Sequence, residues 1–573
     1  MTKEELEEIY KVRGSLSFKK IMTYLPFMIM TNLSNLLLIS VDGLVVGNFV
    51  GTKALASINI FSPIVIIIGV LSNFIAAAIS TYLSVCMGKN DIDKIKRVKH
   101  CSKILMVVST VFIAIAQLPI VYALINSYGV SDNMVKLTWQ YAIGIMISMP
   151  FGMISTIGVC QLQIVGKMKA LMVFSIVEGG VNLILDLLFV GAMNMGIAGA
   201  GYGTALANIL RATMTLVYLY KKTDIFNTGK VKSNLEDMKN ILASGLPELA
   251  SSVMLALQNY MIVKIIVDTF GEDGGVIRGV CTFALSLVLV AINGVMGSIR
   301  PLVGLLTGSR GFKVLRILMR HSFIIISTIV GILTLVIVIY PQGIYYIHGV
   351  KTIPKAGNIS LIIFSMHFLL KGFDAIFRLY FSNRKQSKFS SVVTVVGSMT
   401  MPVFAFIFSK IFAPQWVWAS YILSEMIIFS LNLHKYFSIV RQDYIREENL
   451  GIIYMTVKPR DAVEASRNIR KYANSNGVEQ KISYRMSLCM EEMVAYAVEA
   501  NKKNNINIQI IIRFYKNGGT FLMIDDGKCL ALNEDNHTRN LVTDNYNLLK
   551  KVCKDIKYNY NLDLNYTFFR FEV

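Results

Sequence analysis

Apolar residues fill most of the first 440 positions in long runs, and short polar segments separate these runs. Each run holds about 20 residues or more, which is the length that a helix needs to cross a bilayer. The pattern therefore predicts twelve transmembrane helices. They lie at residues 21–49, 55–86, 101–125, 134–162, 171–192, 195–220, 241–270, 276–306, 314–340, 359–381, 390–412 and 417–439.

The same sequence landmarks occur twice along this region. The matching pairs are YLP at 24–26 with GLP at 245–247, Gly51 with Gly271, and Gly88 with Gly308. In each half, 37 residues separate the first glycine from the second. Two six-helix halves offset by about 220 residues are typical of transporters, which place their binding sites between or within such repeats.

The composition changes near residue 454, where shorter segments of mixed polarity begin. In order, they predict a strand, two helices, a hairpin around an Asn-Gly turn, a helix at 545–556 and two closing strands. The fold class is thus an all-α polytopic membrane protein with a C-terminal cytoplasmic α+β sandwich domain. The expected domains are the two transmembrane halves at 1–220 and 221–440 and the C-terminal domain at 441–573.

The distribution of charge orients the helices. Only 16% of the residues are charged, whereas soluble proteins carry about 25%. The net charge is +21, and the basic residues gather in alternate loops, such as GKNDIDKIKRVKH at 88–100. This is the positive-inside pattern, which argues against a nucleic acid partner and places both termini in the cytoplasm. The seven cysteines form no CxxC pair, so neither a disulfide framework nor a zinc site is indicated.

Four polar side chains fall within the predicted spans of the first half: Asp42, Asn182, Asp186 and Thr204. Asn182 and Asp186 are four residues apart and share a helix face. A carboxylate at mid-membrane costs about 2.5–3.5 kcal/mol on insertion scales, so it usually marks a functional site. These oxygens suit a hard cation such as Na⁺, and a poorly hydrated carboxyl can instead hold a proton. The alternative is that both acids are hydrogen-bonded structural residues.

Two motifs carry a resemblance to a known family. VDGLVVGNFVGTKALASINIFSP, from residue 41, and NLILDLLFV with the downstream GIAGAGYGTALA resemble multidrug and toxic compound extrusion (MATE) transporters over residues 18–439. The resemblance implies a monomeric antiporter in the lipid bilayer of the cell membrane. A coupling Na⁺ or H⁺, bound at Asp42, Asn182, Asp186 and Thr204, would drive export of a small organic substrate, with no resident cofactor.

The second half departs from the family pattern. Arg300 stands in GSIRPLVG, where the family commonly has glutamine before the proline, and Asp374 and Arg378 lie in KGFDAIFRLYF. If Arg300 and Arg378 face the cavity, an anionic or zwitterionic substrate is favoured over a cationic drug. The alternative is that Lys371 and Arg378 pair with Asp374, because positions three and four apart share a helix face. Two further acids within spans, Glu178 and Glu425, are expected to be paired structural residues.

The C-terminal segment resembles the ATP-binding fold of histidine kinases and anti-sigma-factor kinases. Glu492 matches the acidic residue of its helix, and Asp525 and Gly527 match its Asp-x-Gly motif. Tyr496, however, replaces the Mg²⁺-binding asparagine, Cys529 replaces the second glycine, and no Gly-x-Gly loop precedes 548–556. These losses argue against catalysis. They predict a regulatory domain, open to a cytoplasmic regulator, with nucleotide binding at Glu492, Asp525 and Gly527 as the alternative.

Three functions compete on these grounds. The first is a cation-coupled exporter with a regulatory tail, based on the intramembrane acids. The second is a flippase or exporter of an anionic lipid-linked or polysaccharide precursor, based on the basic second half. The third is a membrane sensor with a kinase-like domain, which the missing phosphate loop disfavours.

Overall fold

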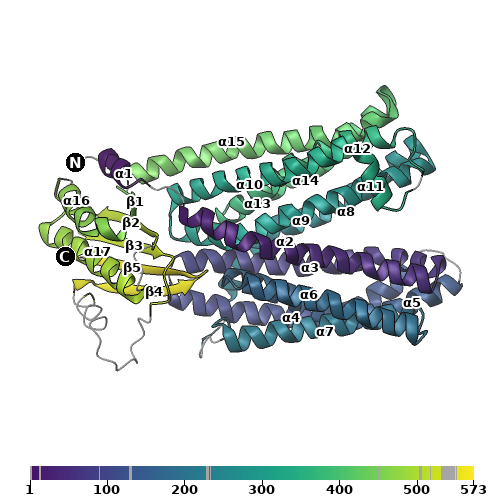
Figure 1. Ribbon diagram of the computed structural model, residues 1–573, viewed down its shortest axis with the longest axis horizontal. Helices are drawn as coiled ribbons and strands as arrows, with labels where there is room; N and C mark the ends of the chain where they lie inside the picture. Colours follow the sequence, from purple (N-terminus) through teal and green to yellow (C-terminus); the bar gives the residue numbers. More distant parts are fainter. Residues whose placement is uncertain are drawn as a thin grey trace.

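The computed structural model gives the protein as a long helical bundle with a small domain at one end (Figure 1). We call the end of the bundle that carries this domain the domain end. The residues that the structure describes are 3–11, 15–89, 91–127, 132–226, 231–232, 234–350, 352–449, 451–475, 477–501, 506–515, 518–530, 549 and 552–572.

The first half of the bundle contains six long helices that run back and forth along its axis (Figure 1). They are α2 (Ser15–Phe49), α3 (Thr52–Gly88), α4 (Ile92–Ser127), α5 (Asp132–Ile164), α6 (Met168–Asp186) and α7 (Ile197–Lys222). A π-helical turn, η1 (Leu187–Ala192), extends α6. A short helix, α1 (Lys3–Ile9), precedes α2.

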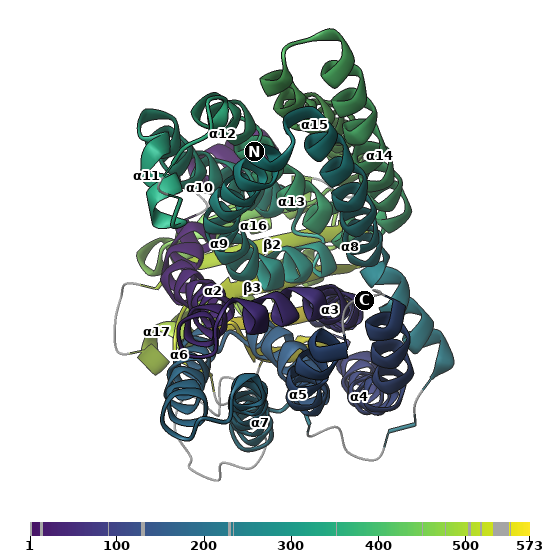
Figure 2. The ribbon, with the colours of Figure 1, turned by 90° about the vertical axis from the view of Figure 1, so that its right-hand side faces the viewer.

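The second half repeats this arrangement with one span broken into two helices. Its elements are α8 (Leu235–Phe270), α9 (Glu272–Gly308), α10 (Phe312–Ile339), α11 (Pro341–Ile347), α12 (Gly357–Ser365), α13 (Phe368–Asn383), α14 (Ser387–Ile411), η2 (Pro414–Trp418) and α15 (Ala419–Asn449). Figure 2 looks along the bundle from the end opposite the domain. It shows α10–α15 on one side and α4–α7 on the other, with α2, α3, α8 and α9 between them.

Within the described residues, eleven helical segments are long and apolar enough to cross a membrane. They correspond to eleven of the twelve predicted spans, and the remaining one, the sixth, is α7. This helix has 26 residues but is rich in Gly, Ala, Thr and Asn. It packs along α5 and α6, so its small and polar residues face neighbouring helices, where they allow close helix packing.

The duplicated glycines occupy equivalent places in the two halves. Gly51 and Gly271 precede α3 and α9 with φ of 107° and 62°, a region that side chains rarely adopt. Gly88 and Gly308 are the last residues of the same two helices, and each helix has 37 residues. These positions agree with the predicted repeat.

Helices α3 and α9 cross in backbone contact at the domain end. A Cβ atom on Gly88 would lie 2.8 Å from Cα of Leu305, and one on Gly308 would lie 2.8 Å from Cα of Gly88. The neighbouring helices close the same end, since Ser244 on α8 donates a hydrogen bond to the Ala78 carbonyl on α3 (3.0 Å). The two halves are therefore closed against each other at the domain end.

The C-terminal domain is a five-stranded antiparallel sheet with two helices on one face. Its strands pair in the order β1-β2-β3-β5-β4. The elements are β1 (Ile453–Val457), η3 (Pro459–Asp461), α16 (Ala462–Ser475), α17 (Gln480–Asn501), β2 (Ile508–Tyr515), β3 (Gly518–Asp525), β4 (Asp555–Asn561) and β5 (Leu564–Glu572). The predicted α+β fold is thus present. Half of the helix predicted at 545–556 lies outside the described residues, and its last two positions, Asp555 and Ile556, belong to β4 instead.

The N-terminal helix α1 belongs structurally to this domain, a contact that the sequence pattern does not predict. Leu6 and Tyr10 are buried in the core between the sheet and α16 and α17. The Thr456 amide of β1 donates a hydrogen bond to the Tyr10 carbonyl (3.0 Å). Glu7 also forms an ion pair with Lys313 of α10 (2.5 Å), so α1 links the domain to the bundle.

We expect Gly88→Ala to destabilise the protein, because its new methyl group would overlap fixed backbone atoms of α9. Overpacking of this kind costs about 1–3 kcal/mol. The matched control is Gly69→Ala on the same helix, where no described atom lies within 4 Å of the new carbon. The midpoint of thermal unfolding in detergent should fall for Gly88→Ala and hold or rise for Gly69→Ala. Equal midpoints would contradict the close crossing.

Candidate functional site

Three helices bring the predicted cation ligands of the first half together. Thr204 of α7 donates a hydrogen bond to Oδ2 of Asp42 on α2 (3.0 Å). Asn182 of α6 donates one to the Thr204 hydroxyl (3.3 Å). Asp186 follows Asn182 by one turn, and its carboxyl lies within hydrogen-bonding reach of the Asp42 carboxyl. All four residues are at most 8% exposed.

Several oxygens of this cluster lack a partner. Oδ1 of Asp42, Oδ1 of Asn182 and both carboxylate oxygens of Asp186 are buried and accept no hydrogen bond from any described residue. Buried polar atoms are nearly always satisfied, and leaving them unpaired is costly. Four such acceptors on three neighbouring residues are available to a proton, a cation or water.

The local backbone shapes this cluster. Asp186 is the last residue of α6 before the π-helical turn η1, and π-turns inside helices are frequent at functional sites. Gly203 lies against its side chain, and a Cβ there would be only 2.5 Å from Oδ1 of Asp186. Glycine at 203 thus lets α7 approach the carboxylate.

The donor set fits a hard cation or a proton. Carboxylate, amide and hydroxyl oxygens are the ligands that hard cations prefer. Across the part of the chain that the structure describes, no three His, Cys, Asp or Glu side chains gather as a metal site. The cluster instead combines two adjacent carboxylates, which can share one proton, with the oxygens of Asn182 and Thr204.

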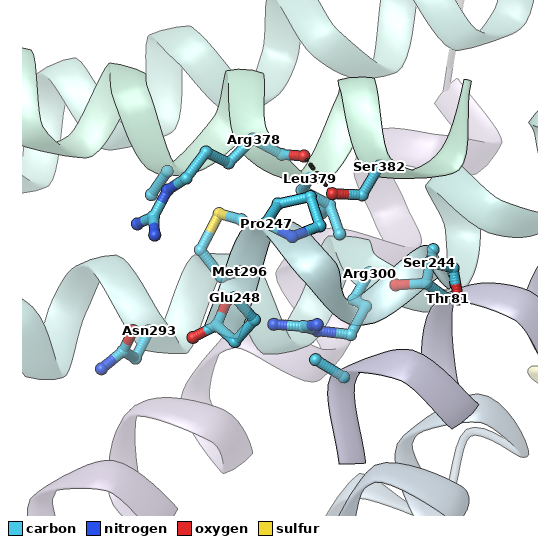
Figure 3. A pocket seen from close by; sticks show the side chains of 12 residues that line it. Thr81, Ser244, Pro247, Glu248, Asn293, Met296, Arg300, Arg378, Leu379 and Ser382 are labelled. Carbon is cyan, nitrogen blue, oxygen red and sulfur yellow. Dashed lines mark hydrogen bonds between the residues drawn. The ribbon is translucent and has the colours of Figure 1, made fainter. Parts of the chain in front are cut away.

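A small polar cavity, shown in Figure 3, lies between α3 of the first half and α8, α9 and α13 of the second half. Its volume is about 90 Å³, enough for a few water molecules or one small polar group. Arg300, Arg378 and Glu248 all line it. Among the described residues, Arg300 and Glu248 have no ion-pair or hydrogen-bond partner.

Asp374 does not line this cavity. It forms an ion pair with Arg378 (3.2 Å) and accepts a hydrogen bond from Asn432 (3.2 Å). Lys371 differs from the predicted alternative, because it pairs with Glu425 on α15 (2.8 Å) rather than with Asp374. The other mid-span acid, Glu178, pairs with Arg211 of α7 (2.5 Å), so both extra acids are paired as expected.

Among the described residues, the predicted nucleotide-binding residues do not line a common cavity. Glu492 lines a hollow between η3, α16 and α17. Asp525 and Gly527 lie elsewhere, and Oδ1 of Asp525 accepts hydrogen bonds from the Gly527 amide (2.9 Å) and from Asn565 (2.7 Å). Burial raises the pKa of Asp525 to about 6. Residues 543–547, where the sequence lacks the Gly-x-Gly phosphate loop of that fold, lie outside the described residues.

Sequence reasoning missed three residues at these sites. Gly203 lies against Asp186, and Glu248 lines the small polar cavity. Tyr141 of α5 is buried close enough to interact with Asp42 and Asp186. Gly203 stands next to Thr204 in the Gly-rich motif, so its spacing could have indicated it. Tyr141 and Glu248 reach their sites through helix packing, for which one sequence gives no local signal.

Comparisons with known proteins agree with this arrangement. A family model described as MatE matches residues 28–188. The multidrug export protein MepA of Staphylococcus aureus (strain NCTC 8325 / PS 47) is 23% identical over 304 residues, which cover 52% of this chain and 66% of MepA. MepA of Staphylococcus haemolyticus (strain JCSC1435) is 21% identical over 434 residues, or 74% of this chain and 93% of that protein.

Solved structures share the fold of the bundle. A MATE crystal structure in a straight conformation aligns with a TM-score of 0.70, at 20% identity, over 75% of this chain and 97% of that one. A MOP superfamily transporter from Pyrococcus furiosus, whose binding pocket is described as having reverse polarity, aligns with a TM-score of 0.69 and the same identity and coverage. The solved structures show that the bundle has the fold of MATE transporters, and the family match and the curated relatives support a multi-pass membrane transporter that is similar to this family.

Proposed function

We propose that the protein is a secondary antiporter in which entry of Na⁺ or H⁺ drives export of small organic molecules from the cell. The observation that carries the proposal is the set of four buried, unpartnered oxygens on Asp42, Asn182 and Asp186. The relatives named as multidrug export proteins support the substrate class. The basic loops at the domain end support a cytoplasmic position for that end.

The geometry suggests how ion binding reaches the closed end of the bundle. A bound cation or proton would offset one of the two negative charges of Asp42 and Asp186, which lie on different helices, α2 and α6, and so reduce the repulsion between these helices. Helix α2 also reaches the domain end, where Met28 and Ile29 pack against Gly297 and Gly294 of α9. A shift of α2 at Asp42 would therefore disturb the contact between the two halves.

A second candidate concerns the charge of the substrate. Arg300 and Arg378 line one cavity, and Arg300 has no partner among the described residues. A charge within a membrane protein that forms no ion pair is costly and usually functional. A carboxylate or phosphate group of an anionic or zwitterionic substrate would pair with Arg300, and this includes the anionic precursors of a flippase.

Removing either carboxylate of the first site should uncouple transport. We expect Asp42→Asn and Asp186→Asn to lose about 1.5–3 kcal/mol of cation binding, which is roughly tenfold or more in affinity. The measurement is substrate export from proteoliposomes under separate Na⁺ and H⁺ gradients, which also identifies the ion. Asp93→Asn, on an exposed part of α4, is the control. Cation-driven export at wild-type rates in both site variants would refute the coupling site.

Gly203→Ala should damage the same site without removing any ligand, because its methyl group would displace Asp186. A saturating concentration of the coupling ion should raise the midpoint of thermal unfolding of the wild type, and we expect this rise to be much smaller in Gly203→Ala. Gly180→Ala, two residues from Asn182 on α6 and with no described atom within 4 Å, should keep it. If Gly203→Ala retains the full ion-dependent shift, Asp186 does not bind the ion in the position seen.

Arg300→Gln should change which substrates are exported. Loss of the cation is expected to lower export of an anionic dye relative to a cationic dye by about tenfold, since a charged hydrogen bond contributes about 1.5–3 kcal/mol. Arg320→Gln, exposed on α10, is the control. Efflux of both dyes, followed by fluorescence in the same vesicles, gives the ratio. If the ratio of anionic to cationic dye export is unchanged, Arg300 does not select substrates by their charge.

A further inference from the structure

The sheet of the C-terminal domain is buried on both faces. Side chains alternate between the two faces of a strand. On β2, Ile510 and Ile512 join the core with α16 and α17, whereas Ile511 joins the core of the membrane bundle. The other residues of the sheet that pack into the bundle core are Tyr454, Leu522, Ile524, Leu564, Tyr566 and Phe568. The domain is therefore docked on the bundle through one face of the sheet, with apolar contacts from β1, β2, β3 and β5.

One edge of this docked face binds the first half. The Tyr24 hydroxyl of α2 donates a hydrogen bond to the Leu562 carbonyl (2.8 Å), and the Lys20 ammonium donates one to the Asp563 carbonyl (3.0 Å). Leu562 itself is fully buried in the bundle core. On the same side, Lys19 forms an ion pair with Asp526 (2.9 Å).

The turn that makes this contact is strained. Leu562 and Asp563 have φ of 58° and 52°, a left-handed region that is unusual for a bulky side chain such as leucine. Two-residue turns of this kind favour Asn-Gly. Strained backbone persists where the surroundings enforce it, and it often marks a clamp or a switch. Here the strain orients Leu562 into the bundle.

The other part of the docked face binds the second half. The Arg513 guanidinium of β2 donates a hydrogen bond to the Ser309 carbonyl, just after α9. The Tyr454 hydroxyl of β1 donates one to the Arg310 carbonyl (3.2 Å). One sheet thus bonds to both halves, and strands β2 and β3 lie behind the centre of the bundle in Figure 2.

Between these two sets of contacts lies the crossing of α3 and α9. A cavity of about 320 Å³ separates the sheet from the crossing. Gly88 and Gly308 line it on the side of the bundle, and Ile511 and Leu522 line it on the side of the sheet. When the halves separate at this end, the two sets of contacts must move apart. A hydrogen-bonded sheet cannot follow both, so its binding favours the closed arrangement.

We propose that the C-terminal domain is a clamp that binds the two halves only while they are closed at the domain end. Each opening of that end then requires the sheet to release at least one half, and the strength of docking sets how often it opens. The proposal rests on the proposed transport function only in requiring that the halves separate there. Any signal that binds the undocked domain would favour opening by mass action.

Leu562→Ala tests the clamp in the full-length protein. It removes a side chain that packs into the bundle and leaves the core with α16 and α17 unchanged. In hydrogen–deuterium exchange of the protein in nanodiscs, we expect faster exchange in β4 and β5. We also expect about tenfold faster exchange at 84–88 and 305–309, which corresponds to about 1.4 kcal/mol of docking. Val463→Ala, exposed on α16, is the control and should match the wild type.

A second variant tests the clamp independently, in case Leu562→Ala misfolds. Tyr24→Phe removes one hydroxyl from α2 and changes nothing in the domain, and Tyr122→Phe, exposed on α4, is its control. Faster exchange at both helix ends supports the clamp. The clamp would be overturned if hydrogen exchange became faster only within the C-terminal domain, or if neither Leu562→Ala nor Tyr24→Phe changed exchange at the two helix ends. The readout needs neither substrate nor cation, so failure of the coupling site would not affect it.

Discussion

Backbone contact between α3 and α9 at Gly88 and Gly308 sets the state of the whole bundle. Because neither residue has a side chain, the two helices meet more closely than any other pair of residues would permit. This crossing closes one end of the space between the halves, and the sheet lies over it across a cavity of about 320 Å³.

The cation cluster and the crossing are joined by α2. This helix carries Asp42, packs against α9 at Met28 and Ile29, and binds the domain through Tyr24. Unpaired oxygens at the cluster make the occupied and empty states differ strongly in electrostatic energy. A single helix that reaches all three regions gives such a difference a physical route to the closed end.

The sequence predicts features that depend on local pattern. Apolar runs locate the helices, and the spacing of Asn182 and Asp186 places both on one face, where the structure has them. Pairings between distant elements are not predictable in this way: Lys371 finds Glu425, which is 54 residues away, instead of the nearer Asp374. The docking of the sheet, in contrast, is visible in the sequence. Three consecutive isoleucines at 510–512 break the alternation expected of a strand with one buried face and indicate a strand that is buried on both faces.

The contacts that fasten the domain also impose an order on biosynthesis. Tyr24 and Leu562 are 538 residues apart in the chain, so the ribosome makes helix α2 long before the turn that binds it. The membrane helices must insert and assemble with their crossing uncovered, and contacts of such long range form late. Until translation passes residue 562, the nascent transporter therefore exists without its restraint, and a chain that terminates early would keep that unrestrained form.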